Sequence, residues 1–133
     1  MRQPTTAEAL VRASVEAYNR HDLDGCIALL APDATWEVLG MGPPLNVEEL
    51  RIALWQYFVR DSRVEIRTLA AVGPRVYAEY TQSYTEDDQH RRLVAPIACV
   101  YELADGLIAR VRQYYHPSWE RPQGNSDAPP PTG

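Results

Sequence analysis

The spacing of the apolar residues changes once along this chain, near Arg63, and this change limits the possible folds more than any other feature. Before Arg63, apolar residues such as Leu10, Val11 and Val15 recur at the intervals of an amphipathic helix. After Arg63, apolar and polar residues alternate, as in a strand with one buried face. Helices followed by closely linked strands are typical of an α+β domain with the helices packed on one face of an antiparallel sheet.

Three helices are expected in the first half of the chain. The first covers residues 5–19 and starts with the spacing of a capping box. The second covers residues 23–30 and is closed by Pro32. The third follows Asn46, because an Asn three residues before Glu49 is a second capping signature.

Strands are expected where residues with high β-propensity alternate with polar ones. The expected strands cover residues 35–39, 63–72, 75–84, 92–103 and 107–115. The connections after residue 63 are short turns, which implies antiparallel pairing between successive strands.

A single domain is expected, since the chain has 133 residues and 45% of them are hydrophobic. This domain is expected to cover residues 1–117. Residues 118–133 are rich in proline, and we expect them to form a disordered tail.

Charge and composition argue against several classes of protein. The formal net charge is −5 and the 13 basic residues are scattered, so a nucleic-acid partner is not expected. The sequence contains neither a long apolar run nor a signal-peptide pattern, which favours a cytoplasmic protein without a membrane partner.

Metals and cofactors are not expected either. The two cysteines, Cys26 and Cys99, lie far apart and are interpreted as reduced thiols in the core. No His or carboxylate group has the spacing of a metal site, and Gly40 and Gly42 lack the strand-to-helix context of a phosphate-binding loop.

Three stretches of the sequence carry a resemblance to a known family. They are AYNRHDLD at residues 17–24, APDAT at residues 31–35, and DGLI at residues 105–108, which is followed by Tyr114 and Tyr115. With the order of the elements, they resemble the nuclear-transport-factor-like (NTF2-like) cone fold. The resemblance is strongest to the SnoaL-like polyketide cyclases, relatives of the ketosteroid isomerases and limonene-epoxide hydrolases, and covers roughly residues 5–117. It implies a curved sheet that the helices close into a cone with one apolar pocket for a small organic molecule.

Alternation along the strands predicts which side chains would face such a pocket, because every second residue of a strand shares one face. The residues expected to contact a substrate are Ser14, Tyr18, Trp36, Val38, Leu54, Phe58, Cys99, Tyr101, Val111 and Tyr115.

Four residues are candidates for catalysis: Tyr80, Gln82, Gln113 and His116. The first three are expected to bind carbonyl or enol oxygens and to stabilise negative charge that develops on them. An inward-facing amide needs hydrogen-bond partners, which favours a ligand or water role for Gln82 and Gln113. A shift of one residue in the pattern would instead place both amides on the outer face. His116 is the titratable candidate near the pocket mouth, although alternation places it on the opposite face from Gln113.

The resemblance also shows where this chain differs from its relatives. It places Val38, Ser14 and Cys99 at the catalytic Asp, Tyr and protonated Asp of the ketosteroid isomerases. Cys99 and Gln113 correspond to the His and Asp of the SnoaL-like cyclases, and neutral side chains correspond to the Arg and two Asp of the epoxide hydrolases. A neutral amide cannot act as a general base near pH 7, so the usual proton abstraction of these families is not expected.

The leading hypothesis is a cofactor-independent cyclase or isomerase of specialised metabolism, such as antibiotic biosynthesis, that acts on a small hydrophobic polyketide-like or terpenoid-like substrate. An enzyme is favoured over the alternative of a non-catalytic binding or accessory protein. A second alternative is an epoxide-opening hydrolase or cyclase. A homodimer is expected through the outer sheet face, where Tyr77, Glu79 and Arg110 mix aromatic and charged groups.

Overall fold

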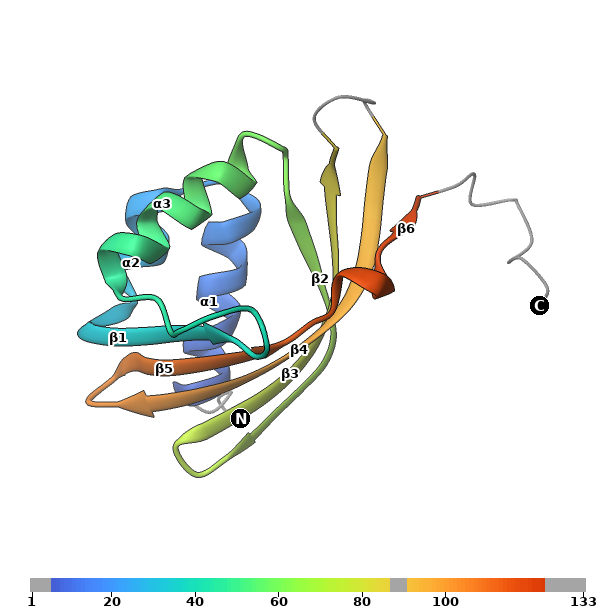
Figure 1. Cartoon of the computed structure of the whole chain (residues 1–133). Coiled ribbons are helices and arrows are strands. Elements are labelled where there is room, and N and C mark those ends of the chain that lie inside the picture. Colours follow the sequence, from blue (N-terminus) through green and yellow to red (C-terminus); the bar gives the residue numbers. More distant parts are fainter. Residues whose placement is uncertain (1–5, 87–90, 124–133) are drawn as a thin grey trace.

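The computed structural model describes residues 6–86 and 91–123 of the chain. In chain order, the elements are α1 (Thr6–Asn19), α2 (Leu23–Ala28), β1 (Leu30–Val38), α3 (Val47–Phe58), β2 (Arg63–Val72), β3 (Arg75–Thr85), β4 (Arg92–Ala104), β5 (Leu107–Tyr114), the 3₁₀ turn η1 (Pro117–Trp119) and β6 (Arg121–Pro122). The strands form a 6-stranded sheet in the order β1-β5-β4-β3-β2, and β6 pairs with β4. The predicted α+β fold, with helices packed against a mostly antiparallel sheet, is confirmed (Figure 1).

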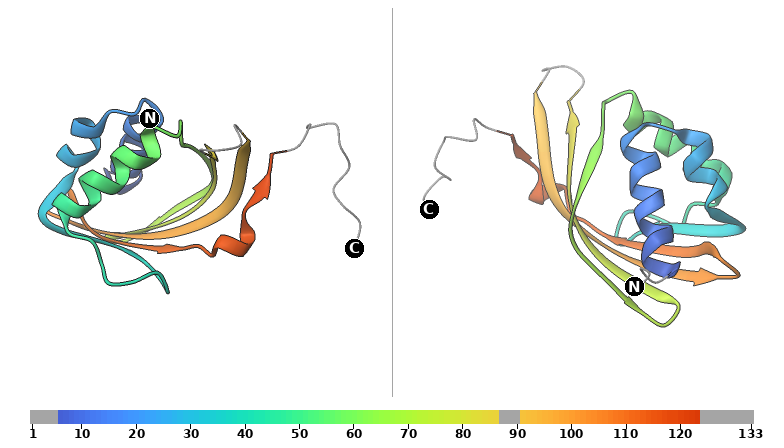
Figure 2. Two further views of the ribbon diagram at one scale, coloured as in Figure 1. Left: turned by 45° about the horizontal axis from the view of Figure 1, so that its top comes forward. Right: turned by 180° about the vertical axis from the view of Figure 1, so that it is seen from behind.

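The sheet is strongly curved, and its concave face wraps around the helices (Figure 2). The pairing register shifts between Ile66 and Thr68 in β2, and between Glu102 and Leu103 in β4. Such irregularities bend a strand and increase its twist, so they account for part of the curvature. The curved sheet and the helices together enclose the interior of the domain.

The first strand differs from the expectation in length and in direction. Residues 23–30 were expected to be helical up to Pro32, but α2 ends at Ala28 and β1 already begins at Leu30. β1 pairs in parallel with β5, and the register between them shifts between Leu30 and Thr35. Pro32 lies within this irregular stretch. Its missing backbone N–H therefore removes no hydrogen bond of the regular pairing between β1 and β5. Pairing with β5 therefore outweighs the helical pattern in this segment.

Side-chain caps fix the starts of the two helices that follow α1. Asn46 Oδ1 accepts a hydrogen bond from the Glu49 backbone N–H at 2.9 Å, and Glu49 Oε1 accepts one from the Asn46 backbone N–H at 3.0 Å. This is the predicted capping box of α3. Asp22 caps α2 by accepting from the Gly25 backbone N–H at 2.9 Å. No helix in the described part of the chain is long and apolar enough to cross a membrane.

The start of the C-terminal segment is folded, which corrects the expectation of a disordered tail from residue 118 onwards. Residues Pro117–Trp119 form η1, and β6 pairs with Leu93 and Val94 of β4. Glu120 lies between these two elements and accepts hydrogen bonds from Tyr84 of β3 and from Tyr115, which follows β5. Residues 124–133, the remainder of the expected tail, lie outside the described residues.

The outer face of the sheet exposes two aromatic side chains, Tyr77 and Tyr114. Charged groups share this face, including Arg110, which forms an ion pair with Glu102. The homodimer expected through this face stays a prediction. Light scattering at micromolar concentration should give twice the chain mass of 15.0 kDa, and a monomeric mass would contradict the dimer.

The core prediction concerns Ile108, which is completely buried between β1 and β4. Replacing Ile108 with Ala should lower the free energy of unfolding by about 2–5 kcal/mol, because the lost methyl groups leave a cavity. Urea unfolding followed by circular dichroism measures this change. Ile52→Ala on the exposed face of α3 is the matched control and should change stability by less than about 0.5 kcal/mol. Equal effects of the two substitutions would contradict the assigned core.

Candidate functional site

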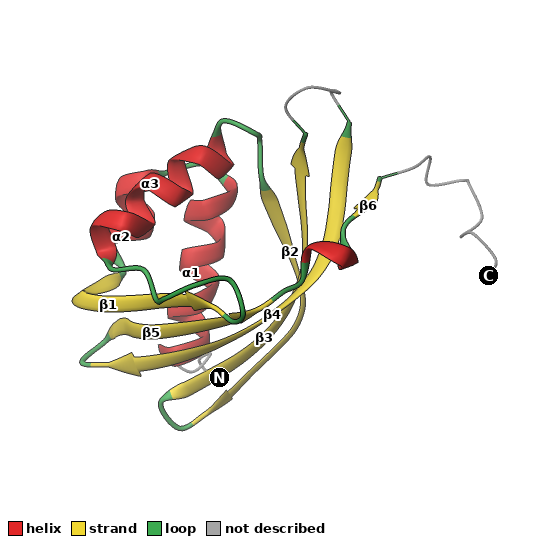
Figure 3. Cartoon of the chain, viewed as in Figure 1, coloured by secondary structure: helices red, strands yellow, loops and turns green. Residues whose placement is uncertain are grey.

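A cavity of about 110 Å³ lies between the helices and the concave face of the sheet. Figure 3 shows α1, α2 and α3 on this side of the strands. The cavity is lined by Ser14, Val15, Tyr18, Trp36, Val38, Leu45, Leu50, Ala53, Leu54, Tyr57, Val64, Tyr80, Gln82, Ile97, Cys99, Tyr101 and Gln113. Most of this lining is apolar. Apart from the hydroxyls of Ser14 and Tyr57, its polar side chains fall into three groups.

The first polar group consists of two tyrosines and a cysteine on the sheet. The hydroxyl oxygens of Tyr80 and Tyr101 are hydrogen-bonded at 2.7 Å, and Cys99 lies on the same face of β4 as Tyr101. Burial raises the pKa of the Cys99 thiol to about 12 and holds the pKa values of Tyr80 and Tyr101 well above 10. All three groups therefore stay protonated near neutral pH and can donate hydrogen bonds, but they cannot act as bases.

The second polar group joins β1 to β5. The indole Nε1–H of Trp36 donates a hydrogen bond of 2.9 Å to Oε1 of Gln113. The Trp36 ring stands edge-on to Tyr101, with ring centroids 6.2 Å apart, so the first two groups are in contact. Gln113 Nε2 has no hydrogen-bond partner in the described part of the chain.

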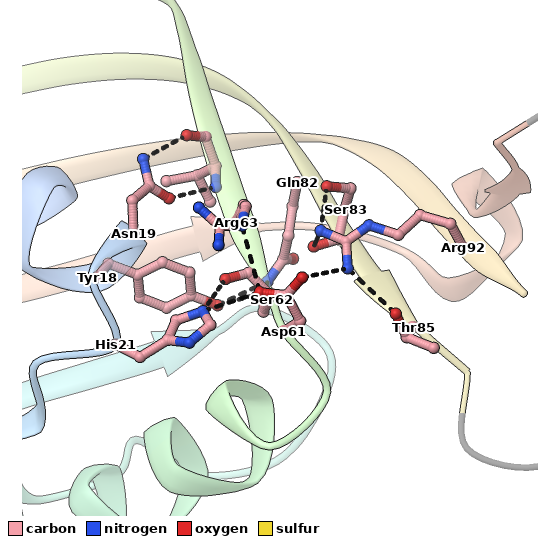
Figure 4. A network of polar contacts seen from close by, with 11 residues as sticks. Tyr18, Asn19, His21, Asp61, Ser62, Arg63, Gln82, Ser83, Thr85 and Arg92 are labelled. Carbon is pink, nitrogen blue, oxygen red and sulfur yellow. Dashed lines mark hydrogen bonds and ion pairs between the residues drawn. The ribbon is translucent and has the colours of Figure 1, made fainter. Parts of the chain in front are cut away.

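The third polar group joins α1, the α3–β2 connection and β3 (Figure 4). Tyr18 OH and Ser62 Oγ are 2.6 Å apart, and Gln82 Nε2 lies 3.1 Å from both oxygens. Ser62 is completely buried, and Gln82 is the other buried polar residue of the described chain. Burial raises the pKa of Tyr18 to about 12, while the hydrogen bonds from Ser62 and Gln82 act in the opposite direction. Tyr18 is therefore also a neutral hydroxyl at physiological pH.

A shell of contacts holds Ser62 in place (Figure 4). The Nε2 atom of His21 lies 3.0 Å from the Ser62 carbonyl oxygen and 3.5 Å from a carboxylate oxygen of Asp61. Asn19 exchanges two hydrogen bonds with the backbone of Val64, at 2.9 and 2.8 Å. His21 and Asp61 have left-handed backbones, with φ of 57° and 52°. These contacts fix the connection from α3 to β2. They therefore also fix the position of Ser62, whose hydroxyl accepts a hydrogen bond from Gln82.

The lining contains no charged side chain among the residues that the structure describes. Within residues 6–86 and 91–123, no group of three or more His, Cys, Asp and Glu side chains is placed to hold a metal ion. The polar lining consists of hydroxyls, two amides, an indole N–H and a thiol. Such groups can orient a ligand and stabilise charge on its oxygen atoms.

Most of the predicted site residues come together around this cavity. Those in the lining are Ser14, Tyr18, Trp36, Val38, Leu54, Tyr80, Gln82, Cys99, Tyr101 and Gln113. Their assignment as catalytic or substrate-binding residues stays a prediction. The predicted inward alternation agrees with this placement on β3, β4 and β5.

Two predicted substrate-binding residues lie in the packed core beside the cavity. Phe58 packs its ring against Tyr18 and His21, with ring centroids 5.2 and 5.0 Å away. Val111 is only 1% exposed and belongs to the main hydrophobic cluster. Neither of them belongs to the residues that line the cavity.

The other two displaced residues lie beyond the end of β5. The hydroxyl of Tyr115 donates to the Glu120 carboxylate instead of facing the cavity. His116 is exposed and precedes η1, where its Nδ1 accepts a hydrogen bond of 3.0 Å from the Ser118 backbone N–H. The catalytic role predicted for His116 has no support from this position.

Sequence reasoning missed several residues of the site. Leu50, Ala53 and Tyr57 follow one another at helical intervals along α3, and this apolar spacing is the sequence signal that α3 covers the pocket. Ser62 lies in a connection without periodicity, so no local pattern marks it.

Glu120 lies in the segment expected to be disordered, and it accepts hydrogen bonds from Tyr115 and from Tyr84. Tyr84 contacts Tyr57 of the lining through ring centroids 6.2 Å apart, which places this carboxylate outside the lining but near one side of it.

An apolar cavity between helices and the concave face of a curved sheet is characteristic of the NTF2-like fold class. The model of the SnoaL-like domain matches residues 11–111. The chain belongs to this SnoaL-like family.

Solved structures support the assignment. A candidate polyketide cyclase from Xanthomonas campestris pv. campestris is 31% identical, with 84% of this chain and 90% of that chain covered and a TM-score of 0.71. An LEH-like epoxide hydrolase from M. tuberculosis is 25% identical over 86% of each chain, with a TM-score of 0.76. SalBIII, an epoxide hydrolase/cyclase-like enzyme in pyran ring formation of the polyether salinomycin, is 18% identical over 90% of this chain and 98% of that chain. Its TM-score of 0.82 shows a shared fold. No curated protein matches this sequence.

The buried thiol leads to a prediction about pH. The pKa of Cys99 rises from 9.0 to about 12 on folding, so between these values the unfolded chain releases a proton that the native chain keeps. Stability then falls as pH rises, and this contribution is fully present below about pH 9. The free energy of unfolding, measured by urea denaturation, should decrease from pH 9 upwards, and Cys99→Ala should flatten the decrease. Parallel pH profiles for the wild type and the variant would contradict the buried thiol.

Proposed function

We propose that this chain binds one small hydrophobic molecule, of polyketide or terpenoid type, and catalyses its cyclisation or isomerisation without a cofactor. The observation that supports this proposal is the polar lining of the cavity, which consists of neutral hydrogen-bonding groups in an apolar surrounding. Isomerisation and ring closure by intramolecular addition both conserve the atoms of the substrate, so neither needs a second reactant.

The apolar walls would contribute by restricting the substrate to a reactive conformation. A ligand enclosed between Leu54, Ile97 and Trp36 loses most of its internal freedom before the reaction. Orientation of this kind lowers the barrier of an intramolecular step, because the entropy has already been lost on binding.

The hydroxyl pair of Tyr80 and Tyr101 would contribute by stabilising charge. One hydroxyl donates to the other at 2.7 Å, and we propose that the second proton of the pair is directed to a substrate oxygen when a substrate is bound. A well-placed donor in a water-excluded site stabilises a developing oxyanion by about 2–4 kcal/mol. Because burial keeps both pKa values well above 10, the donor persists throughout the physiological pH range.

The absence of a base from the described lining limits which ring closures fit this site. A reaction that begins by removing a proton from carbon needs a carboxylate or an imidazole next to that carbon. Addition of a substrate hydroxyl across a carbonyl group or a conjugated double bond needs less assistance. The hydroxyl loses its proton only as the carbonyl oxygen, or the far carbon of the double bond, takes up a proton. The SnoaL-like family and the 31% identity to a candidate polyketide cyclase also favour cyclisation.

A non-catalytic binding protein is the second candidate function. The uncharged lining favours it, because a site that only binds needs no acid or base. An epoxide-opening enzyme is less well supported: opening by water is aided by a base, and Tyr80, Gln82 and Gln113 supply none.

Turnover and binding can be separated in one experiment. The purified chain is incubated with metabolite extracts of its source organism, and the extract is compared with a protein-free control by mass spectrometry. An enzyme converts many equivalents of one compound into an isomer of identical mass and different retention time. A binding protein removes at most one equivalent and shows a thermal shift with the same compound.

The sharpest functional prediction concerns Gln113. Once a turned-over substrate is known, Gln113→Leu should lower kcat/KM by about one to three orders of magnitude, because the amide bonds the substrate oxygen in the transition state. Arg110→Ala on the outer face of the same strand is the control and should have much less effect on the chemical step. Full activity of Gln113→Leu would refute the proposed role.

A further inference from the structure

The two amides of the cavity present atoms of opposite polarity. Gln82 and Gln113 both line the cavity, on β3 and β5, with β4 between them. Each amide has one end occupied by a protein partner, and the occupied ends differ. The other ends remain for a ligand, so they restrict its chemistry.

The amide of Gln113 is oriented by Trp36. An indole N–H can donate a hydrogen bond but cannot accept one, so the partner at 2.9 Å must be the amide oxygen. Trp36 is itself held by two backbone hydrogen bonds with Leu45, at 3.0 and 2.7 Å. The Nε2 amino group, a donor only, is therefore the free end of Gln113.

The amide of Gln82 is oriented in the opposite sense. Its Nε2 group donates towards Tyr18 OH and Ser62 Oγ, each at 3.1 Å, and these two hydroxyls are bonded to each other (Figure 4). Ser62 is completely buried, and His21 Nε2 lies 3.0 Å from its backbone carbonyl oxygen. These contacts hold the Ser62 hydroxyl in the position where it accepts from Gln82. The carbonyl oxygen, an acceptor only, is the free end of Gln82.

We infer that the ligand of this cavity carries a hydrogen-bond acceptor, such as a ketone or ether oxygen, at the Gln113 end and a hydroxyl donor at the Gln82 end. Trp36 and Ser62 act as positioning residues that set these two polarities. This inference rests on the proposed function, because it requires the cavity to be the binding site. An unpaired amide group beside a ligand of the wrong polarity would weaken its binding.

Probe molecules of the right size can test the two ends separately. An engineered apolar cavity of about 150 Å³ binds benzene, so a cavity of about 110 Å³ with an open side suits substituted six-membered rings. Cyclohexanone accepts hydrogen bonds but does not donate them. Phenol is a stronger donor than acceptor, and toluene does neither.

The experiment is a titration of the ¹⁵N-labelled full chain with each probe, followed by ¹H–¹⁵N spectra of the indole and side-chain amide groups. The chain has 3 Trp residues, and Trp36→Phe identifies the Trp36 indole signal. Cyclohexanone should shift the Gln113 amide signals and phenol those of Gln82. Each should bind about three- to tenfold more tightly than toluene, as expected for one net hydrogen bond.

Variants should give a crossed pattern that general loss of structure cannot produce. Gln113→Met should remove the preference for cyclohexanone over toluene and leave the preference for phenol, while Gln82→Met should do the reverse. Trp36→Phe should reduce the cyclohexanone preference several-fold, because the Gln113 amide is then free to turn. Trp55→Phe, at an exposed position of α3, is the matched control and should change neither preference.

Two other outcomes would each overturn a different statement. Binding of all three probes with similar affinity, unchanged in both Met variants, would refute the inferred polarity and leave the cavity as a binding site. If none of the probes, toluene included, shifted any signal of the lining, the proposed function would fail together with the inference.

Discussion

The register of β3, β4 and β5 is the constraint on which the rest of the structure depends. Pairing holds Tyr80 opposite Ile97, and Cys99 opposite both Ala78 and Gln113. One row of alternate side chains across three strands therefore faces the helices. The same row supplies core contacts at one end and cavity lining at the other, so stability and binding rely on the same pairing. A shift of one residue would turn this row to the outer face.

The polar groups of the cavity are tolerated because they are paired with one another. Tyr80 is hydrogen-bonded to Tyr101, and Trp36 donates a hydrogen bond to Gln113. Gln82 donates to the hydroxyls of Tyr18 and Ser62. A buried polar atom without a partner would cost about 1–3 kcal/mol, and pairing avoids most of this cost while leaving some bonding capacity for a ligand. Burial also raises the pKa values of the hydroxyls and of the thiol, which keeps the site uncharged. The chemistry available to the chain is therefore orientation and hydrogen bonding.

Strand alternation and capping patterns predicted much of this arrangement. Alternation placed Tyr80, Gln82 and Gln113 on the inner face, and the capping box at Asn46 marked the start of α3. Local patterns failed where pairing with distant segments decided the structure. Leu30 has helical spacing but pairs with β5, and the proline-rich segment after residue 117 pairs with β4 through β6. The energy of such pairing depends on a partner strand that a sequence window does not contain.

The sequence by itself determined the fold class, the inward rows of the strands and the uncharged character of the lining, because these follow from short-range periodicity and residue type. Only the tertiary structure decided which atom of each amide is free, since the deciding partners lie far away in the chain. Trp36 and Gln113 are 77 residues apart, and Tyr18 and Gln82 are 64 residues apart. Hydrogen bonds between such distant residues form only after the sheet and the helices have packed, and no local spacing in the sequence records them.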